Sequence, residues 1–325
     1  MKLPRRRFLY LAAGLTALPT ASPIAWAQAY PARPVRLVEG FGGGSSADIA
    51  ARLIGRWLSE RLGQPFVVEN RTGAGSNIAT EAVVAAPPDG YTLLTCVTAN
   101  AINATLYEKL NFNFIRDIAP VAGLLRLPLV LLVNQSLPAK TLPEFIAYAK
   151  ANPGKMNMAT PGNGSGPHVA GELFKMKTGI NIVHVPYRGA APAFTDLFAG
   201  QVQVTFAAVP AAIGYIRSGE LRPLAVTSAT RWSELPDLPA VAEFVPGYEA
   251  SGWIGIGAPR DTSAAIIDKL NSNINAGLAD PQLNARIKGL GADPMPMTPT
   301  EFGIFMADET EKWAKVVKFS GAKAG

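Results

Sequence analysis

The sequence predicts an α/β protein with two lobes, each a mainly parallel sheet flanked by helices. Short apolar runs typical of buried strands alternate with segments of helical period along most of the chain. A glycine-rich turn joins a strand to a helix in each half, at residues 40–46 and 161–166. This β-turn-α repetition is typical of open parallel sheets. Ligands of such sheets bind where the turns lie, so we expect the two turns to face one another across a cleft.

The first glycine turn (residues 40–46) is the strongest functional signal in the chain. It follows the strand-like run at 35–38 and precedes a helix with apolar residues at helical spacing up to Leu62. The first N–H groups of a helix have no internal partner and lie at the positive end of its dipole, which suits an anion. Glycines let a ligand approach the backbone, and Ser45 and Ser46 add hydroxyls. The turn is therefore predicted to hold a carboxylate.

The remaining elements follow from periodicity and from Gly, Pro and Asn punctuation. Further strands are expected at 66–70, 91–97, 129–133, 155–160, 182–186, 201–206, 221–227 and 253–258. Further helices are expected at 78–86, 142–150, 192–199, 211–218, 263–279, 281–289 and 299–319, with one more that begins at Pro167. The last helix opens on a capping box, Thr298-Pro299-Thr300-Glu301, and the closing helices complete a lobe.

The N-terminus predicts export. A basic head that includes Arg5, Arg6 and Arg7 precedes an apolar stretch and an Ala25-Trp26-Ala27 cleavage motif, so residues 1–27 are expected to be a signal peptide of the Sec or twin-arginine type. The chain of 325 residues carries 30 Lys and Arg against 24 Asp and Glu. Four of these cations lie in residues 1–27, so the mature chain keeps 26 against 24, a net charge of +2. We expect a periplasmic protein.

Composition excludes several classes of partner. No basic cluster with interleaved aromatic residues indicates nucleic-acid binding. The single cysteine, Cys96, excludes an intrachain disulfide and a thiolate cluster, and no metal-binding motif is present. No cofactor is therefore expected. After the N-terminus there is no apolar run of roughly 18 residues, the length that a membrane span needs.

Two enzyme classes compete for the first turn. Gly42-x-Gly44-x-x-Ala47 fits a dinucleotide fingerprint, with Glu69 as the candidate ribose ligand, which would make the chain a nucleotide-dependent oxidoreductase. Gly43-x-Ser45-x-Ala47 approaches a nucleophile elbow, and Ser165 follows Gly164, which would make it an exported serine hydrolase. A hydrolase needs a base.

The candidate bases are the two histidines. His168, near the start of its helix, is placed for a role in the cleft, whereas His184 in its apolar strand is interpreted as structural. Tyr187 either reaches a ligand or packs, and Asp196, on an apolar helix, is expected to be buried with a partner.

Ordered motifs along the mature chain resemble the receptors of tripartite tricarboxylate transporters, also called Bordetella uptake gene receptors. The opening Tyr30-Pro31-x-Arg33-Pro34-Val35-Arg36 is one of them. Others are Leu62-Gly63-Gln64-Pro65 with Phe66-Val67-Val68-Glu69-Asn70-Arg71, Gly73-Ala74-Gly75, Pro88-Asp89-Gly90-Tyr91-Thr92-Leu93, Val185-Pro186-Tyr187-Arg188-Gly189, Gly200-Gln201-Val202, Ser218-Gly219-x-Leu221-Arg222-x-Leu224-Ala225-Val226-Thr227 and Leu235-Pro236-Asp237-x-Pro239.

The resemblance implies a Venus-flytrap, periplasmic-binding-protein architecture. Lobe 1 would comprise residues 28–125 and 227–325, and lobe 2 residues 126–226. It also implies a solute-binding protein, not an enzyme, that captures a di- or tricarboxylate, an acidic amino acid or an aromatic acid. The protein would be a monomer that delivers its ligand to transporter membrane subunits. The binding residues implied are Phe41, Gly43, Gly44, Ser45, Ser46, Thr160, Gly162, Gly164, Ser165, His168, Tyr187, Gly189, Asp196, Ala207 and the neighbouring Ala208.

The chain departs from the family pattern at four positions. Gly40 stands in place of a proline, Ser45 and Ser76 in place of glycines, and Gln203 in place of an aspartate. Ser45 adds a side chain where the ligand would approach, so the first pocket is expected to differ from the family's.

Overall fold

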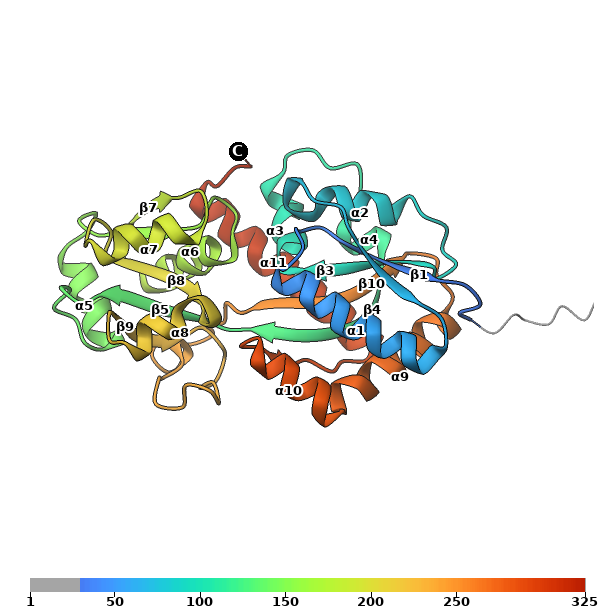
Figure 1. The fold of residues 1–325 in the computed structure, drawn as a ribbon. Helices are drawn as coiled ribbons and strands as arrows, with labels where there is room; N and C mark the ends of the chain where they lie inside the picture. The colour runs from blue at the N-terminus through green and yellow to red at the C-terminus, as the bar shows by residue number, and fades with distance from the viewer. Residues whose placement is uncertain (1–29, 325) are drawn as a thin grey trace, which may run out of the picture.

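The structure is a computed structural model that describes residues 30–324. The predicted export signal, residues 1–27, lies outside the described residues. Two separate sheets, each covered by helices, form the two lobes seen in Figure 1. Among the described residues, no helix combines the length and the apolar character needed to cross a membrane.

Lobe 1 is built on a sheet of strand order β11-β4-β10-β3-β1-β2. β1 pairs in parallel with both β2 and β3, whereas β10 runs antiparallel to β3 and β4. The strands are β1 (Val35–Glu39), β2 (Phe66–Asn70), β3 (Thr92–Val97), β4 (Ile118–Leu127), β10 (Gly252–Pro259) and β11 (Asp293–Pro294).

Lobe 2 is built on a sheet of strand order β7-β6-β8-β5-β9. β6 is parallel to β7 and β8, and β5 is antiparallel to β8 and β9. The strands are β5 (Leu129–Asn134), β6 (Asn157–Thr160), β7 (Val183–Pro186), β8 (Val204–Ala208) and β9 (Leu221–Val226).

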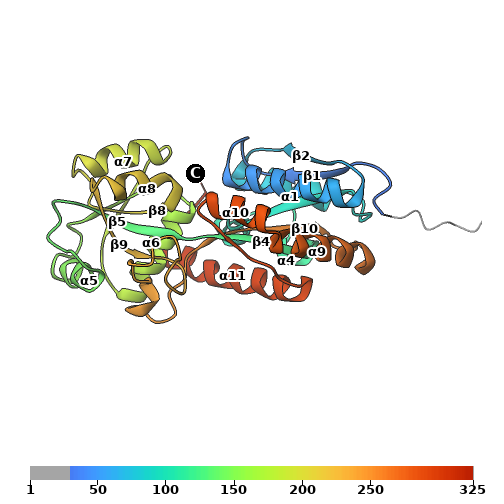
Figure 2. The ribbon, with the colours of Figure 1, turned by 60° about the horizontal axis from the view of Figure 1, so that its bottom comes forward.

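Helices cover both faces of each sheet, as Figures 1 and 2 show. On lobe 1, α1 (Ser46–Leu62), α9 (Ala264–Ala279) and α10 (Pro281–Gly289) share one apolar core, and α2 (Asn77–Val84), α3 (Thr98–Leu106), α4 (Phe114–Asp117) and α11 (Pro299–Ser320) contribute to another. A short 3₁₀ turn, Ala74–Ser76, precedes α2. On lobe 2, α5 (Leu142–Ala151) and α6 (Gly166–Thr178) oppose α7 (Ala190–Phe198) and α8 (Val209–Arg217).

The chain passes between the lobes at two strand junctions. β4 ends at Leu127 in the first sheet and β5 begins at Leu129 in the second, with Pro128 between them. The return enters β10 at Gly252. The segment before it packs on lobe 2, where the Tyr248 hydroxyl donates to the Ala170 carbonyl over 3.0 Å. The lobe boundaries expected at 125/126 and 226/227 stay predictions beside these junctions.

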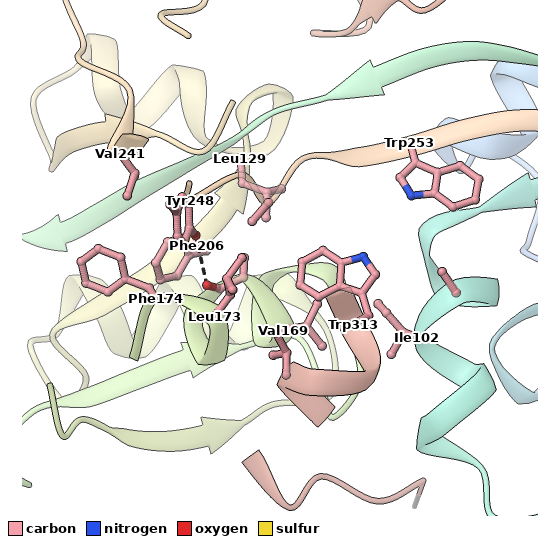
Figure 3. Close-up of a cluster of buried hydrophobic side chains, with 14 of the residues drawn as sticks. Ile102, Leu129, Val169, Leu173, Phe174, Phe206, Val241, Tyr248, Trp253 and Trp313 are labelled. Atoms are coloured by element: carbon pink, nitrogen blue, oxygen red, sulfur yellow. Dashed lines mark hydrogen bonds between the residues drawn. The ribbon is translucent and has the colours of Figure 1, made fainter. Parts of the chain in front are cut away.

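Helix α11 ties the lobes together. Its Trp313 belongs to the buried cluster that also contains Ile102 of α3 and Val169 of α6 (Figure 3). The indole N–H groups of Trp253 and Trp313 both donate to the buried Glu309 carboxylate, each over 2.9 Å. Burial raises the pKa of Glu309, and these two donors with Lys312 satisfy it.

The α/β, two-lobed fold class is confirmed, and the predicted helix and strand segments have counterparts in the structure. Four elements and the direction of some strands were missed. Helices α3 and α4 and strands β4 and β11 had not been predicted, and both sheets are mixed because β5, β10 and β11 run antiparallel to the strands beside them. Strand β10 returns from the other lobe and enters the sheet at the end where β4 leaves it, since Gly252 pairs with Leu127, and this accounts for the opposite direction of β10.

We expect Gly255→Ala to destabilise lobe 1 by about 1–3 kcal/mol, the cost of overpacking a core. A Cβ at Gly255 would collide with the ring of Phe302 and lie 2.8 Å from the Ala122 carbonyl oxygen. Phe302 is itself buried against Trp253, so it has little room to move. Urea denaturation followed by circular dichroism measures the change.

Gly214→Ala is the matched control. Gly214 lies within α8, and a Cβ there meets no atom within 4 Å, so we expect a gain of about 0.5–1 kcal/mol from helix propensity. Equal stability of the Gly255→Ala variant and the wild-type protein would contradict the packing described.

Candidate functional site

The two glycine turns are built in the same way, although they lie in different lobes. Each follows a strand and caps a helix, α1 after β1 and α6 after β6. In the first, the Ser45 N–H donates to the Gly42 carbonyl over 3.2 Å; in the second (residues 161–166), the Ser165 N–H donates to the Gly162 carbonyl over 3.3 Å. Each serine is also the N-cap residue of its helix.

The cap is reciprocal in both turns. Ser45 Oγ accepts from the Asp48 N–H over 3.1 Å, and the Asp48 carboxylate accepts from the Gly44 N–H over 2.9 Å. Ser165 Oγ accepts from the His168 N–H over 3.3 Å, and His168 Nδ1 accepts from the Gly164 N–H over 3.0 Å. Gly44 and Gly164 have φ of 86° and 72°, a conformation that glycine adopts without strain.

The caps decide which amides remain for a ligand. Among the groups that the structure describes, none accepts from the N–H of Ser46 or Ala47, the first two residues of α1. At α6 the first residue, Gly166, keeps such an N–H, but the second is Pro167, which has none. The first turn therefore offers one more helix-start donor than the second.

A polar network supports the first turn from behind. The Phe41 N–H donates to the buried Glu39 carboxylate over 2.9 Å. Asn70 Nδ2 lies 2.9–3.0 Å from the carboxylates of Glu39 and Asp48 and from the Phe41 carbonyl. The Arg52 guanidinium holds the pKa of Asp48 at about 2, whereas burial raises the pKa of Glu39. The Phe41 amide is thus committed to the protein, while its aromatic side chain is half-buried.

A stacked histidine pair supports the second turn. The rings of His168 and His184 lie 3.8 Å apart at 14°, and His184 Nε2 is 2.6 Å from the Thr160 hydroxyl. Burial lowers the pKa of His168 to about 3 and that of His184 to about 4, so both rings are neutral at pH 7. Because His168 Nδ1 accepts a hydrogen bond, its proton resides on Nε2, 3.9 Å from Glu172.

The remaining predicted residues lie on lobe 2 around the second turn. The Tyr187 hydroxyl donates to Asp196 over 2.6 Å, and burial with this carboxylate raises the pKa of Tyr187 to about 12. Asp196 thus has the partner that was predicted for it, but it is half-buried and not buried as expected. The Gly189 N–H donates to the Pro161 carbonyl, which fixes the turn after Tyr187 against the second turn.

An apolar pocket of about 140 Å³ lies beside the second turn. It is bordered by Pro161 of the second turn, by Pro167 of α6, and by Ala207 and Ala208 of β8. Three helices, α6, α7 and α8, begin at this pocket, since Pro167, Ala190 and Ala211 of their first turns all line it. The positive ends of three helix dipoles therefore meet there.

Both turns lie toward the junction of the lobes. A Cβ added to Gly164 would collide with Leu106 of α3, so the second turn touches lobe 1. The start of α1 lies at the end of lobe 1 nearest lobe 2 (Figure 1). The ligand-binding roles of the residues named from the sequence stay predictions. Sequence reasoning did not identify Glu39, Arg52 and Asn70 as a support, because their contacts join distant segments.

The geometry bears on the enzyme alternatives. Ser165 Oγ donates to the Gly162 carbonyl over 2.7 Å, and the nearby His168 Nδ1 is occupied by the Gly164 N–H. Neither is therefore poised as nucleophile and base. Glu69, the candidate ribose ligand, is paired with Arg36 and Arg71.

Comparison with known proteins places the chain in a family. A family model described as "Tripartite tricarboxylate transporter family receptor" matches residues 50–321. Protein BugT of Bordetella pertussis is 39% identical over 306 residues, which are 93% of this chain and 94% of BugT. A protein of the tcbD-tcbE intergenic region of Pseudomonas sp. strain P51 is 35% identical over 291 residues, 89% of this chain and 87% of that protein.

Solved structures agree. Rpa4515 of R. palustris, solved with adipate, is 38% identical with a TM-score of 0.76, over 90% of this chain and 99% of that one. MatC from Rhodopseudomonas palustris, solved with bound malate, is 31% identical with a TM-score of 0.72. The match covers 89% of this chain and 100% of MatC. These matches span nearly the whole described fold. The chain therefore belongs to the tripartite tricarboxylate transporter receptor family, whose members are periplasmic solute-binding proteins.

Proposed function

We propose that this protein is an extracytoplasmic receptor that captures a small carboxylate between its lobes and delivers it to the membrane subunits of a tripartite tricarboxylate-type transporter. The observation that carries the proposal is the shared construction of the two turns. Each turn uses some of its backbone N–H groups in its own cap and leaves helix-start N–H groups for which residues 30–324 provide no acceptor. Such donors at the positive end of a helix dipole favour an anion.

The two caps would attract the anion through helix dipoles and not through a charge of their own, with the exposed Arg188 beside the second turn as an added cation. Arg52 is paired with Asp48 of the first cap, and the histidines behind the second turn are neutral. Uncharged donors suit a receptor that must release its ligand again after closure. The adipate and malate seen with two relatives are small carboxylates and support this ligand class.

Isothermal titration calorimetry of the purified protein with adipate and with malate tests the proposal, with hexane-1,6-diol as the uncharged control. We expect at least one carboxylate to bind and the diol not to bind. A one-site ligand at a hundredfold excess over its Kd should add about 2.7 kcal/mol of stability. Failure of a wider set of small carboxylates to bind would overturn the proposal.

We expect Ala47→Pro to weaken carboxylate binding about tenfold to a hundredfold. Proline removes the Ala47 N–H, and a hydrogen bond to a charged group contributes about 1.5–3 kcal/mol. The helix should persist, because α5 and α8 already carry proline at the same position, Pro143 and Pro210. Calorimetry measures the affinity, and circular dichroism checks the fold.

Ala265→Pro is the matched control for this change. Ala265 is the exposed second residue of α9 in lobe 1, and its N–H has no partner among the described groups. We expect its affinity to equal that of the wild-type protein. If Ala47→Pro also bound normally, the start of α1 would not be the anion seat.

We expect the unfolding free energy to fall as the pH drops from about 6.5 toward 3. The unfolded chain protonates both histidines near their ordinary pKa of 6.5, whereas the folded pKa values are about 3 and 4. The unfolded state thus binds more protons in this window, and stability rises with pH. Glu172, Lys175 and His184 are the titratable groups that face His168.

His168→Asn should reduce the slope of the unfolding free energy against pH, because unfolding would then take up as much as one proton fewer. The asparagine Oδ1 can still accept from the Gly164 N–H, so the cap persists without a titrating ring. Urea denaturation at several pH values between 3 and 7 measures both slopes. An unchanged slope in the variant would show that His168 does not titrate as described.

A further inference from the structure

We propose that the pocket beside the second turn is the subsite for an apolar ligand body, so that the preferred ligand is a carboxylate with an aromatic ring or a short aliphatic chain. This inference rests on the proposed carboxylate-binding function and narrows its ligand class. The pocket, of about 140 Å³, is lined by residues of β8 and of the first turns of α6, α7 and α8.

The walls of the pocket are small and apolar. Five alanines line it: Ala190, Ala193, Ala207, Ala208 and Ala211. Ala190 and Ala211 are exposed, so the pocket opens to solvent, whereas Ala193 and Ala207 are buried at its base. Alanine leaves room for a guest and contributes no polar atom from its side chain. When a ligand covers this exposed apolar surface and removes it from water, the change in free energy favours binding.

One wall is a fixed aromatic ring. Phe194 packs on Phe198 with ring centroids 6.2 Å apart and on Tyr215 at 5.3 Å. Phe194 is itself buried, so its ring cannot swing away to admit a bulkier or hydrated group. A preformed apolar wall suits a planar ring or a methylene chain.

The lining residues, all of which lie in the described part of the chain, include no charged side chain. Thr205 is the polar residue among them, and its hydroxyl already donates to the Ala159 carbonyl over 2.8 Å. A hydroxyl or second carboxylate buried here would lose its water and find no side chain to replace it, which costs free energy. The walls therefore select against hydroxylated and polycarboxylate bodies.

The charge at the helix starts completes an amphipathic arrangement. Three positive dipole ends at the rim favour a carboxylate head, and the alanine and phenylalanine walls favour an apolar body. The volume fits this division, because a cavity of about 150 Å³ with apolar walls is known to hold a benzene molecule. A body of about six carbon atoms is thus the expected size.

Calorimetry with four probes tests the inference on the purified protein: benzoate and hexanoate against malate and citrate. We expect benzoate or hexanoate to bind at least tenfold more tightly than malate and citrate. Ala193→Leu, which fills the base of the pocket, should weaken benzoate or hexanoate at least tenfold. Ala199→Leu, at the exposed end of α7 outside the pocket, is the matched control and should leave affinity unchanged.

The outcomes separate the two proposals. Tighter binding of malate or citrate, unaffected by Ala193→Leu, would overturn the apolar subsite and leave the receptor function intact. Failure of all four probes, and of other small carboxylates, would overturn both. If Ala193→Leu does not fold, Ala211→Leu at the exposed rim provides the same steric test, and unchanged affinity for benzoate and hexanoate there would overturn the subsite.

Discussion

The hydrogen bond from a turn glycine to the third residue of the following helix determines the shape of both candidate binding turns. Asp48 accepts from Gly44 and His168 accepts from Gly164, while the serine at each N-cap binds the backbone of the same acceptor residue. Each cap contributes about 1 kcal/mol to its helix. More importantly, the pair of bonds fixes the glycine backbone at positive φ and selects which amides stay available for a ligand.

The two caps share their backbone geometry but differ in charge: the acceptor side chain is ionised in lobe 1 and neutral in lobe 2. Asp48 is ionised, and its charge is balanced by Arg52 and by hydrogen bonds from Gly44 and Asn70. His168 is neutral because its buried ring lies against His184. A buried charge without a partner costs free energy. In lobe 1 the charge of Asp48 is paired, and in lobe 2 His168 carries no charge. Neither cap therefore carries a net charge, and at the second turn the exposed Arg188, whose neighbours Tyr187 and Gly189 donate to Thr160 and Pro161, adds a positive charge to the helix dipoles.

Local pattern was enough to predict the turns, the helices they cap and the two-lobed fold class. The region of β4 was missed because Pro120, Gly123 and Arg126 interrupt its apolar run, although the strand lies inside the sheet between β10 and β11. The shared spacing Gly-x-Gly-Ser-x-x-Asp and Gly-x-Gly-Ser-x-x-His is visible in the sequence and could have revealed the common cap. The hydrogen bond from Asn70 to Asp48 could not have been predicted from local sequence, because it depends on the pairing of β1 with β2.

If the ligand binds to both turns as proposed, its affinity depends on how closely the two lobes approach. A ligand that touches both turns gains its full set of hydrogen bonds only when they are close, so part of the binding free energy is used in closure. The contact of Leu106 with Gly164 and the packing of α11 on α6 already hold the second turn at the lobe junction. Pro128, which cannot donate to a strand ladder, separates β4 from β5 where the sheets part. A change of lobe angle at this junction would leave the internal hydrogen bonds of both turns intact but would move the contact between Gly164 and Leu106.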